Sequence, residues 1–401
     1  MKKTILIAGS GFAGFWAAIA AMRAVSLAGK ADEISVIMVS PAPNVTIRPR
    51  LYEAVLENMA PDISAQLAVT GVQYVAGRVE GIDTDNKRVT ARLNDGQEMA
   101  LAYDRFVLAA GSYGAIPPVS GFAEHSFNVD TLEGAQCLET HLLDLKHKPH
   151  TAARNTVVVV GGGLTGLESA TEMPQRLRAI LGNEDVRVVI VDSAAEVGAG
   201  MGAEASAVIQ QALQECGVEP RASVRVTAVD AGSVTLSDGE QIAADTVILA
   251  AGMRASPLTE QIPGERDNSG RVLGDAYLHA PAAPGVFVTG DTVKVPTDNA
   301  GNYNVMSCQH AMSLGRVAGY NAAAELTGLP LHPYSQPKYV TCLDLGTWGA
   351  LFTEGWERKV LVTGAEGKKI KQEINTLWIY PPKADRDALF AIANPDFVIV
   401  P

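Results

Sequence analysis

The sequence has few cysteines, and they are scattered. Among its 401 residues the cysteines are Cys137, Cys216, Cys308 and Cys342, and no two of them form a Cys-x-x-Cys pair. The seven histidines are equally dispersed. This scatter favours reduced, mostly structural thiols, and it predicts no metal site, no redox-active disulfide and no nucleophilic triad.

Long apolar runs and an excess of positive charge are also lacking. The net charge is −12, so no basic surface for nucleic acid is expected. The start Met1-Lys2-Lys3 resembles that of a signal peptide, but Gly9, Gly11 and Gly14 interrupt the apolar stretch behind it. No run is long and apolar enough to span a bilayer, so we expect a cytoplasmic protein that is at most peripheral to the inner face of the membrane.

Glycine, in contrast, is abundant. The 38 glycines and the hydrophobic content of 47% fit a globular α/β protein, in which tight turns join strands to helices. A chain of 401 residues is too long for one ordinary core, so two or three domains are expected.

A glycine-rich motif occurs twice, each time between an apolar strand and a helix. Gly-Ser-Gly-Phe-Ala-Gly at residues 9–14 follows a predicted strand at 4–8, and Gly-Gly-Gly-Leu-Thr-Gly at 161–166 follows one at 156–160. The first glycine of such a motif allows the tight turn, the second lets the backbone approach a pyrophosphate, and the third packs the helix on the strand. The N-terminus of the helix then faces the phosphates. Two motifs in this context predict two dinucleotide-binding domains.

The two halves of the sequence remain similar beyond these motifs. A second apolar strand, at residues 34–39 and 186–191, ends at Ser40 and at Asp192, equally far from the third glycine of each half. Each half closes with Leu-Ala-Ala-Gly, and the last glycines are Gly111 and Gly252. A carboxylate at the position of Asp192 accepts both hydroxyls of an adenosine ribose and repels a 2′-phosphate, which predicts NADH rather than NADPH. A solvated loop acid is the alternative.

A third motif, Gly-Val-Phe-Val-Thr-Gly-Asp, lies at residues 285–291. With it, residues 1 to about 330 resemble the two-dinucleotide-binding flavoproteins of the pyridine nucleotide-disulfide reductase superfamily. The resemblance implies an α/β fold with two Rossmann-like, doubly wound domains and a small α+β C-terminal domain. It assigns residues 1–118 and 266–330 to FAD, residues 119–265 to NAD(P)H and residues 331–401 to an interface domain. It also implies that Asp291 binds the ribityl arm of FAD.

Within this superfamily the chain looks most like type II NADH dehydrogenases and their apoptosis-inducing-factor-like relatives. Gly-Leu-Thr-Gly-Leu-Glu at 163–168 is similar to the family segment whose glutamate lies beside the nicotinamide. Residues 48–53 resemble the segment that lines the flavin, Arg78-Val79 the strand that meets the adenine, and residues 307–311 the helix start beneath the flavin pyrimidine. The alternatives are an exposed helix residue for Glu168 and an ordinary helix N-terminus around Gln309.

The residues that these motifs imply form two sets. For FAD they are Gly9, Gly11, Phe12, Ala13, Gly14, Ser40, Arg48, Pro49, Val79, Ala110, Gly111, Gly290, Asp291, Gln309 and His310. For the nicotinamide nucleotide they are Gly161, Gly163, Leu164, Thr165, Gly166, Glu168, Asp192 and Gly252. Glu168 and Gln309 are the two expected to act at the reacting rings.

Two positions depart from the family pattern. Ser40 stands where FAD-binding members usually carry an acid, so its hydroxyl or a nearby side chain is expected to hold the adenosine ribose. Ser313 replaces the second glutamine of the quinone site in type II dehydrogenases. The resemblance therefore implies that hydride passes from NADH to FAD, and electrons then pass to a quinone or to another small-molecule or small-protein acceptor.

Two alternatives remain. One is a redox-sensing flavoprotein like the apoptosis-inducing-factor relatives. The other resembles the sulfide:quinone oxidoreductases, which place a catalytic cysteine in a region comparable to that of Cys342. Such enzymes also need a partner cysteine near the flavin, and because neither Cys137 nor Cys216 is convincingly placed, a core position for Cys342 is preferred.

Beyond residue 330 the chain is proline-rich and then carries a helical stretch at 368–380, which Pro381-Pro382 ends. Its apolar residues at helical spacing and the nearby lysines are Ile370, Ile374, Leu377, Trp378, Lys368, Lys369 and Lys371. Such a helix could meet a membrane surface or a partner. It could equally pack on its own domain or on the second subunit of a homodimer.

Overall fold

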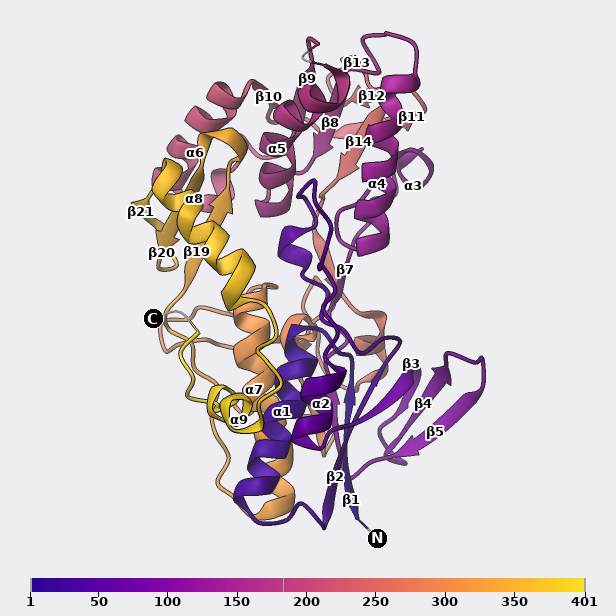
Figure 1. The fold of residues 1–401 in the computed structure, drawn as a ribbon, viewed down its shortest axis with the longest axis vertical. Helices are drawn as coiled ribbons and strands as arrows, with labels where there is room; N and C mark the ends of the chain where they lie inside the picture. Colours follow the sequence, from indigo (N-terminus) through magenta and orange to yellow (C-terminus); the bar gives the residue numbers. More distant parts are fainter. Residues whose placement is uncertain (1, 183, 400–401) are drawn as a thin grey trace.

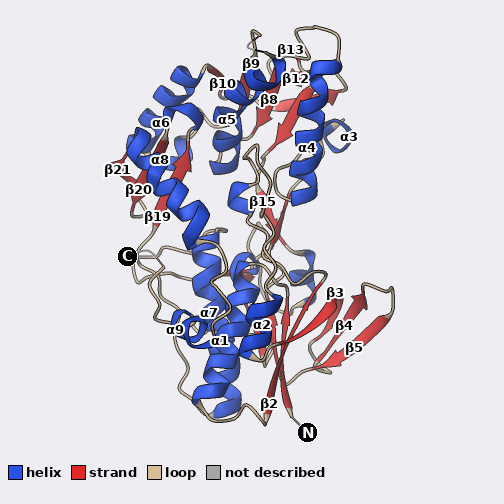
Figure 2. Ribbon diagram, in the orientation of Figure 1, coloured by secondary structure: helices blue, strands red, loops and turns tan. Residues whose placement is uncertain are grey.

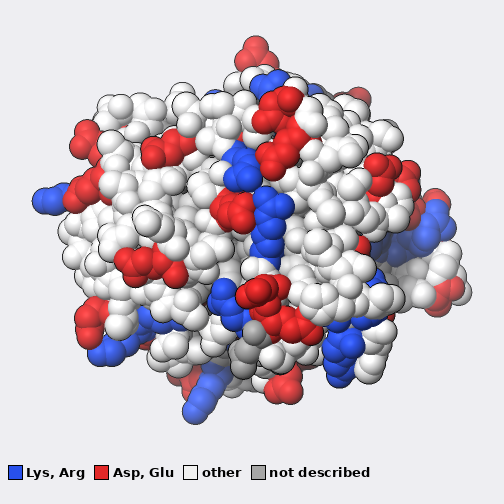
Figure 3. Space-filling view, turned by 90° about the horizontal axis from the view of Figure 1, so that it is seen from above, with Lys and Arg blue, Asp and Glu red and all other residues white. Residues whose placement is uncertain are grey.

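The computed structural model describes residues 2–182 and 184–399. Two α/β domains lie one above the other in Figure 1, and the C-terminal elements, in yellow, run along one side of both. Figure 2 shows the same arrangement with the strands of each domain flanked by helices. Seen from above, acidic and basic side chains are interspersed, with no broad basic area on that face (Figure 3).

The lower domain is built on a seven-stranded sheet in the order β17-β6-β1-β2-β3-β4-β5. Its strands are β1 (Lys3–Ala8), β2 (Ile34–Ser40), β3 (Gln73–Asp83), β4 (Arg88–Leu93), β5 (Glu98–Ala102), β6 (Arg105–Leu108) and β17 (Val286–Val288). Neighbouring strands from β17 to β3 are parallel, whereas β4 and β5 pair antiparallel. The pairing of β17 with β6 returns a late part of the chain to the first sheet, as a discontinuous domain requires.

Three helices pack against this sheet: α1 (Phe12–Leu27), α2 (Ser64–Thr70) and α7 (Cys308–Thr327). The backbones of α1 and α7 touch, because a Cβ atom at Gly315 or Gly319 would overlap the carbonyl oxygen of Ala13 or Ala17. Small residues allow this approach and fix the position of the start of α7 relative to the glycine-rich turn before α1.

The upper domain repeats the plan of the lower one. Its four-stranded parallel sheet, β10-β9-β8-β14, consists of β8 (Thr156–Val160), β9 (Arg187–Val191), β10 (Val218–Arg221) and β14 (Thr246–Leu249). An antiparallel sheet of β11 (Val226–Asp230), β12 (Ser233–Leu236) and β13 (Gln241–Ala243) matches the β3-β4-β5 part of the first domain. The helices are α3 (Phe122–His125), α4 (Leu132–Asp144), α5 (Leu164–Leu181) and α6 (Ala203–Cys216).

The chain crosses between the domains along two adjacent strands. β7 (Ser112–Gly114) pairs antiparallel with β15 (Met253–Ala255), so the way into the upper domain and the way out lie side by side. A further short parallel pair, β16 (Val272–Leu273) and β18 (Val293–Lys294), belongs to the return into the lower domain.

The C-terminal elements contact both domains. They are β19 (Val340–Asp344), β20 (Ala350–Glu354), β21 (Lys359–Val362), α8 (Gly364–Glu373), a π-helix at Ile374–Trp378, and α9 (Arg386–Ile392). The antiparallel β19-β20-β21 sheet and its associated elements contact α5 and α6, whereas α9 contacts α1 and α2.

These elements confirm the predicted fold class. The predicted strands at 4–8, 34–39, 156–160 and 186–191 correspond to β1, β2, β8 and β9. The predicted helix at 368–380 begins earlier, at Gly364, and continues as the π-helix. Within the described ranges, no helix is both long and apolar enough to cross a membrane. The domain limits at residues 118, 265 and 330 stay predictions.

Candidate functional site

A cavity of about 520 Å³ lies where the two domains and the C-terminal elements meet. One side is formed by the first glycine-rich turn and the loop after β6, and another by the first residues of α5 and α7. β19, the end of α8 and the π-helix complete the wall. Sites between domains with a mostly apolar lining commonly bind small molecules.

The first glycine-rich turn has the geometry of a phosphate site. Gly9 has a φ of +111°, and a Cβ atom there would overlap the carbonyl oxygen of Ala109. A Cβ atom at Gly14 would overlap Gly9, which shows that the third glycine packs the helix on the strand. At Gly11 nothing lies within 4 Å of the Cβ position, and α1 begins there with no side-chain cap and no acid in its first turn. Its free N–H groups are therefore available to an anion.

The second turn repeats this geometry residue for residue. Gly161 has a φ of +112°, nothing lies within 4 Å of a Cβ atom at Gly163, and one at Gly166 would overlap Gly161. α5 likewise starts without a side-chain cap. Leu164, Thr165 and Glu168 of this helix reach the cavity wall, while the glycines lie outside it.

Asp192 holds the second turn in place. Its Oδ2 accepts a hydrogen bond from the N–H of Gly162 at 2.5 Å, and its Oδ1 accepts one from the N–H of Ala194 at 2.8 Å. Asp192 is half-buried and bonded to the backbone on both sides, and its binding of a ribose stays a prediction. Two arginines of the same sheet have acidic partners: Arg187 pairs with Glu219, and Arg221 with Glu219 and Glu240.

Asp291 lies in the cavity wall at the end of the third motif. The Ser112 hydroxyl donates to Asp291 Oδ2 at 2.5 Å, and the Arg48 guanidinium is 3.9 Å from the same oxygen. Burial raises the pKa of Asp291, and the Ser112 hydrogen bond and Arg48 oppose that shift. Arg48 also lies 3.6 Å from Asp130, next to which the chain enters α4.

The first turn of α7 also faces the cavity, with Ser307, Cys308 and Gln309 in its wall. Ser307 caps the helix by accepting the N–H of His310. The Gln309 Nε2 is buried and has no hydrogen-bond partner within the described part of the chain. A buried amide without a partner is costly, so this donor is available to a bound group. His310 is fully buried against Tyr339 and Trp356 and does not reach the cavity.

One face of α8 and the π-helix forms the far wall. Lys371, Ile374, Asn375 and Trp378, at helical spacing, all line the cavity. Ile374 and Trp378 of the predicted apolar stripe therefore pack within the protein, which is one of the alternatives that the sequence left open, and a membrane or partner contact of this helix stays a prediction. Of the residues on the predicted face, Lys369 and Leu377 remain exposed.

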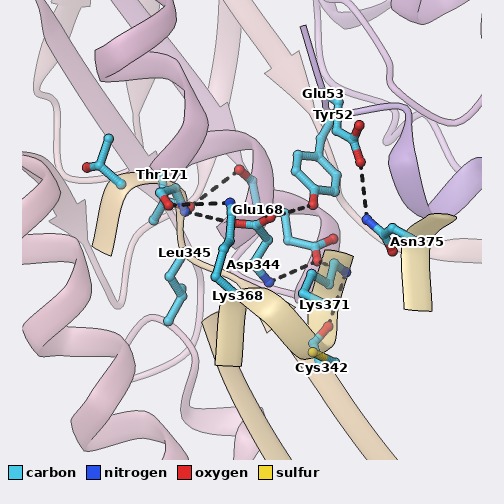
Figure 4. A network of polar contacts seen from close by, with 12 residues as sticks. Tyr52, Glu53, Glu168, Thr171, Cys342, Asp344, Leu345, Lys368, Lys371 and Asn375 are labelled. Atoms are coloured by element: carbon cyan, nitrogen blue, oxygen red, sulfur yellow. Dashed lines mark hydrogen bonds and ion pairs between the residues drawn. The ribbon is translucent and has the colours of Figure 1, made fainter. Parts of the chain in front are cut away.

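Lys371 forms a buried ion pair with Glu168 (Figure 4). The Lys371 Nζ is 2.6 Å from Glu168 Oε1 and donates to the Cys342 carbonyl at 3.1 Å. Burial raises the pKa of Glu168, although Lys371 opposes this. Burial would also lower the pKa of Lys371, but the Glu168 carboxylate outweighs it and the pKa is raised, so the ammonium is charged at neutral pH.

Further polar contacts join the domains around this pair (Figure 4). Asp344 accepts hydrogen bonds from Lys368 at 2.6 and 2.7 Å and from the Tyr52 hydroxyl at 2.9 Å. The Asn375 amide donates to Glu53 at 3.1 Å. Residues from the lower domain and the C-terminal elements are thus connected beside Glu168, which belongs to the upper domain.

Two cysteines line the cavity, Cys308 and Cys342. The prediction that Cys342 is a core residue is therefore wrong, because β19 presents it to the cavity. Burial raises the pKa of Cys308 to about 11 and that of Cys342 to about 12. Both thiols are protonated at neutral pH.

The predicted residues fall into two groups. On the cavity wall lie Gly9, Gly11, Phe12, Ala13, Arg48, Pro49, Ala110, Gly111, Leu164, Thr165, Glu168, Asp291 and Gln309. Away from it lie Gly14, Ser40, Val79, Gly161, Gly163, Gly166, Asp192, Gly252, Gly290 and His310. The sequence did not indicate Ser112, Met253, Tyr339, Lys371, Asn375 or Trp378. Lys371 and Trp378 belong to the amphipathic stretch at 368–380, but the sequence leaves open whether that stretch meets a membrane, a partner or its own domain.

Ser40 lies beside the first turn. Its hydroxyl is 2.7 Å from that of Ser10 and donates to the Ala42 carbonyl at 2.9 Å. This hydroxyl is therefore already engaged within the protein, and Ser10, unlike Ser40, reaches the cavity wall.

Comparisons with known proteins define the class. The chain matches the pyridine nucleotide-disulphide oxidoreductase family over residues 3–315, so it belongs to that family and is an oxidoreductase. It is 46% identical over 396 residues to the NADH dehydrogenase-like protein Rv1812c of Mycobacterium tuberculosis, covering 98% of each chain. It is 29% identical over 360 residues to the demethylphylloquinone reductase NdbB of Synechocystis, covering 88% of this chain and 87% of that one.

A solved structure shows the same fold. NDH2 from Plasmodium falciparum in complex with NADH superimposes with a TM-score of 0.79 at 14% sequence identity, covering 98% of this chain and 97% of that one. At this identity the likeness concerns the fold alone. The arrangement of two α/β domains and a C-terminal unit is therefore shared by both chains.

Proposed function

We propose that the protein oxidises NADH with FAD as its bound cofactor and passes the electrons to a quinone. The observation that carries the proposal is the single cavity that joins the first glycine-rich turn, the start of α5 and the mostly apolar wall of β19 and the π-helix. A donor, a flavin ring and an acceptor all need access to one enclosure. The relative named NADH dehydrogenase-like and the one named demethylphylloquinone reductase support this choice.

In this proposal each domain has one nucleotide. The N–H groups at the start of α1 hold the FAD phosphates, with Gly9, Gly11 and Asp291 around the cofactor. The turn at residues 161–166 and Asp192 hold NADH, whose nicotinamide end reaches past Leu164 to Glu168. The domain limits are those predicted from the sequence, at residues 118, 265 and 330.

FAD, when bound, supplies the centre that accepts hydride and releases electrons. The protein's own contribution is alignment and electrostatics. The N–H groups at the start of α7 and the unpartnered Gln309 amide offer donors to negative charge on the ring. Ile374 and Trp378 exclude water on the far side and give an apolar face to the acceptor ring. Ser313 stands where type II dehydrogenases carry the second glutamine of the quinone site, and it does not line the cavity. In this proposal the acceptor is therefore bound without a side chain at that position.

Sulfide is not favoured as the electron donor. A sulfide oxidoreductase needs reactive cysteine thiolates near the flavin, since the thiolate is the nucleophile. The raised pKa of Cys308 and of Cys342 keeps both as thiols at neutral pH. NADH therefore remains the proposed donor.

Anaerobic stopped-flow spectroscopy tests the proposal. Mixing the flavin-loaded protein with NADH should bleach the flavin absorbance, and a soluble quinone should restore it. Steady-state turnover on the order of 10 per second would fit an enzyme, whereas near-stoichiometric reduction would indicate a redox sensor. A flavin that NADH leaves oxidised would overturn the proposal.

A further inference from the structure

Residues 394–399 follow α9 and reach the cavity. The chain turns at Asn394, whose carbonyl accepts the N–H of Phe397 at 2.9 Å. Two residues further on, Ile399 forms part of the cavity wall together with Ile379 and Trp378. The end of α9 therefore positions a short segment whose Ile399 forms part of the cavity wall.

Arg316 anchors this segment from α7. It is only 2% exposed, and its Nε donates to the Ile392 carbonyl at 2.7 Å. Its guanidinium lies 3.9 Å from the ring centre of Trp16 and 5.1 Å from that of Phe397. Burial lowers the pKa of Arg316 to about 9, so it is still charged at neutral pH.

The surroundings of the Arg316 guanidinium are unusual for a buried cation. No carboxylate lies within ion-pair distance of Arg316 in residues 2–182 and 184–399. A buried charge is costly unless other groups stabilise it. The faces of two aromatic rings and two backbone carbonyls take that role here, which makes the position of Phe397 part of what keeps the guanidinium buried.

The segment is only partly buried: Pro395 is buried and Asn394 and Ile399 are half-buried, whereas residues 396–398 are exposed. Asp396 accepts from His332 at 2.8 Å, but its side chain is 72% exposed, and exposed pairs contribute little to stability. Phe397 is 41% exposed and Val398 is 66% exposed. A segment with few buried contacts opens locally at low cost.

We propose that residues 394–399, held by the contact of Arg316 with Phe397, set the size of the electron acceptor that can enter the cavity. Displacement of Ile399 enlarges the cavity at that part of its wall. Glu168 and Gln309 are held by other elements and stay in place. Large acceptors are therefore affected more than small ones, and reduction by NADH is not affected. This inference rests on the proposed function.

The test uses the flavin-loaded protein and three variants. Phe397→Ala removes the ring from the anchor, and Arg316→Met removes the charge at similar volume. Val398→Ala is the matched control, because Val398 is the next residue, is exposed and lies off the cavity wall. Flavin reoxidation after anaerobic reduction is measured with 1,4-benzoquinone and with a naphthoquinone that carries a long isoprenoid chain. Quenching of flavin fluorescence by acrylamide is measured on the same samples.

We expect Phe397→Ala and Arg316→Met to raise the naphthoquinone rate relative to the benzoquinone rate by about threefold or more, the effect of losing one cation–π contact. Acrylamide quenching should rise in the same variants and stay unchanged in Val398→Ala. An unchanged rate ratio together with unchanged quenching would overturn the inference, and Phe397→Ala decides it if Arg316→Met does not fold. If NADH fails to reduce the flavin, the proposed function fails, while the quenching of the oxidised protein still decides whether the segment controls access.

Discussion

Lys371 and Glu168, 203 residues apart in the chain, form a buried ion pair of 2.6 Å that links α8 to α5. Removing one partner leaves an uncompensated charge, and breaking such a pair usually costs about 3–5 kcal/mol. We expect Lys371→Met to lower the free energy of unfolding by that amount in urea denaturation. The double variant with Glu168→Gln should recover a large part of the loss, because no charge is then left unpaired. A loss below about 1 kcal/mol in the single variant would mean that solvent reaches the pair.

The two glycine-rich turns allow a matched pair of substitutions. Gly11 and Gly163 both have negative φ and no atom within 4 Å of the Cβ position, so alanine fits the protein at either place. Gly11→Ala should reduce FAD retention at least tenfold while NADH binding persists, since only the bound pyrophosphate meets the new methyl group. Gly163→Ala should do the reverse.

Flavin absorbance of the purified protein and calorimetric titration with NADH measure the two affinities separately. Circular dichroism checks that both variants are folded. If each variant retained both nucleotides at the affinity of the parent protein, the assignment of the turns would be wrong.

Asp192 should determine the choice of nicotinamide nucleotide. Its carboxylate faces the second turn, and Arg187 and Arg221 are paired with acids, so no free cation among them awaits a 2′-phosphate. Charge-assisted hydrogen bonds contribute about 1.5–3 kcal/mol, so NADH should be preferred at least tenfold in the rate of flavin reduction. Asp192→Asn keeps an acceptor for the Gly162 N–H but removes the negative charge. This substitution should therefore reduce the preference for NADH over NADPH. Equal rates with NADH and NADPH in the parent protein would contradict this role.

The lowered pKa of the buried His310 predicts that the stability of the protein depends on pH. Burial lowers its pKa to about 4 from the ordinary 6.5, with a smaller contribution from Arg271. Between these values the unfolded chain binds a proton that the folded chain does not, so the free energy of unfolding falls as the pH falls from 6.5 toward 4. The loss can reach about 3 kcal/mol. Urea denaturation across this range should show a smaller pH slope in His310→Asn than in the parent protein, and parallel slopes would exclude His310 as the cause.

The sequence predicted those parts of the site that depend on local backbone geometry. Gly9 and Gly161 take positive φ in tight turns, and Asp192 follows directly after a strand, so motif spacing was sufficient to predict this local geometry, while the binding of a nucleotide by Gly161 and Asp192 stays a prediction. Glu168 was expected in the cleft because it follows the turn by two residues. The return of the chain to the first domain could also be predicted, because the strand before Asp291 is short and apolar and is followed by the Gly-Asp pair.

The part of the cavity wall that α8, the π-helix and β19 form could not be predicted in the same way. Lys371 can be buried because its charge pairs with that of Glu168. The two residues meet only when the C-terminal elements pack on α5. The amphipathic pattern of residues 368–380 identifies a helix but does not say which neighbour covers it. Cys342 likewise depends on the orientation of β19, which the sequence of a single strand leaves open.

The pairing of β7 with β15 gives the upper domain adjacent ends. A module with adjacent ends can be inserted into a surface turn of another protein, or removed from one, without interrupting the host's sheet. The β7–β15 pair therefore marks where the upper domain could be exchanged for another α/β domain while the seven-stranded sheet of the lower domain stays intact.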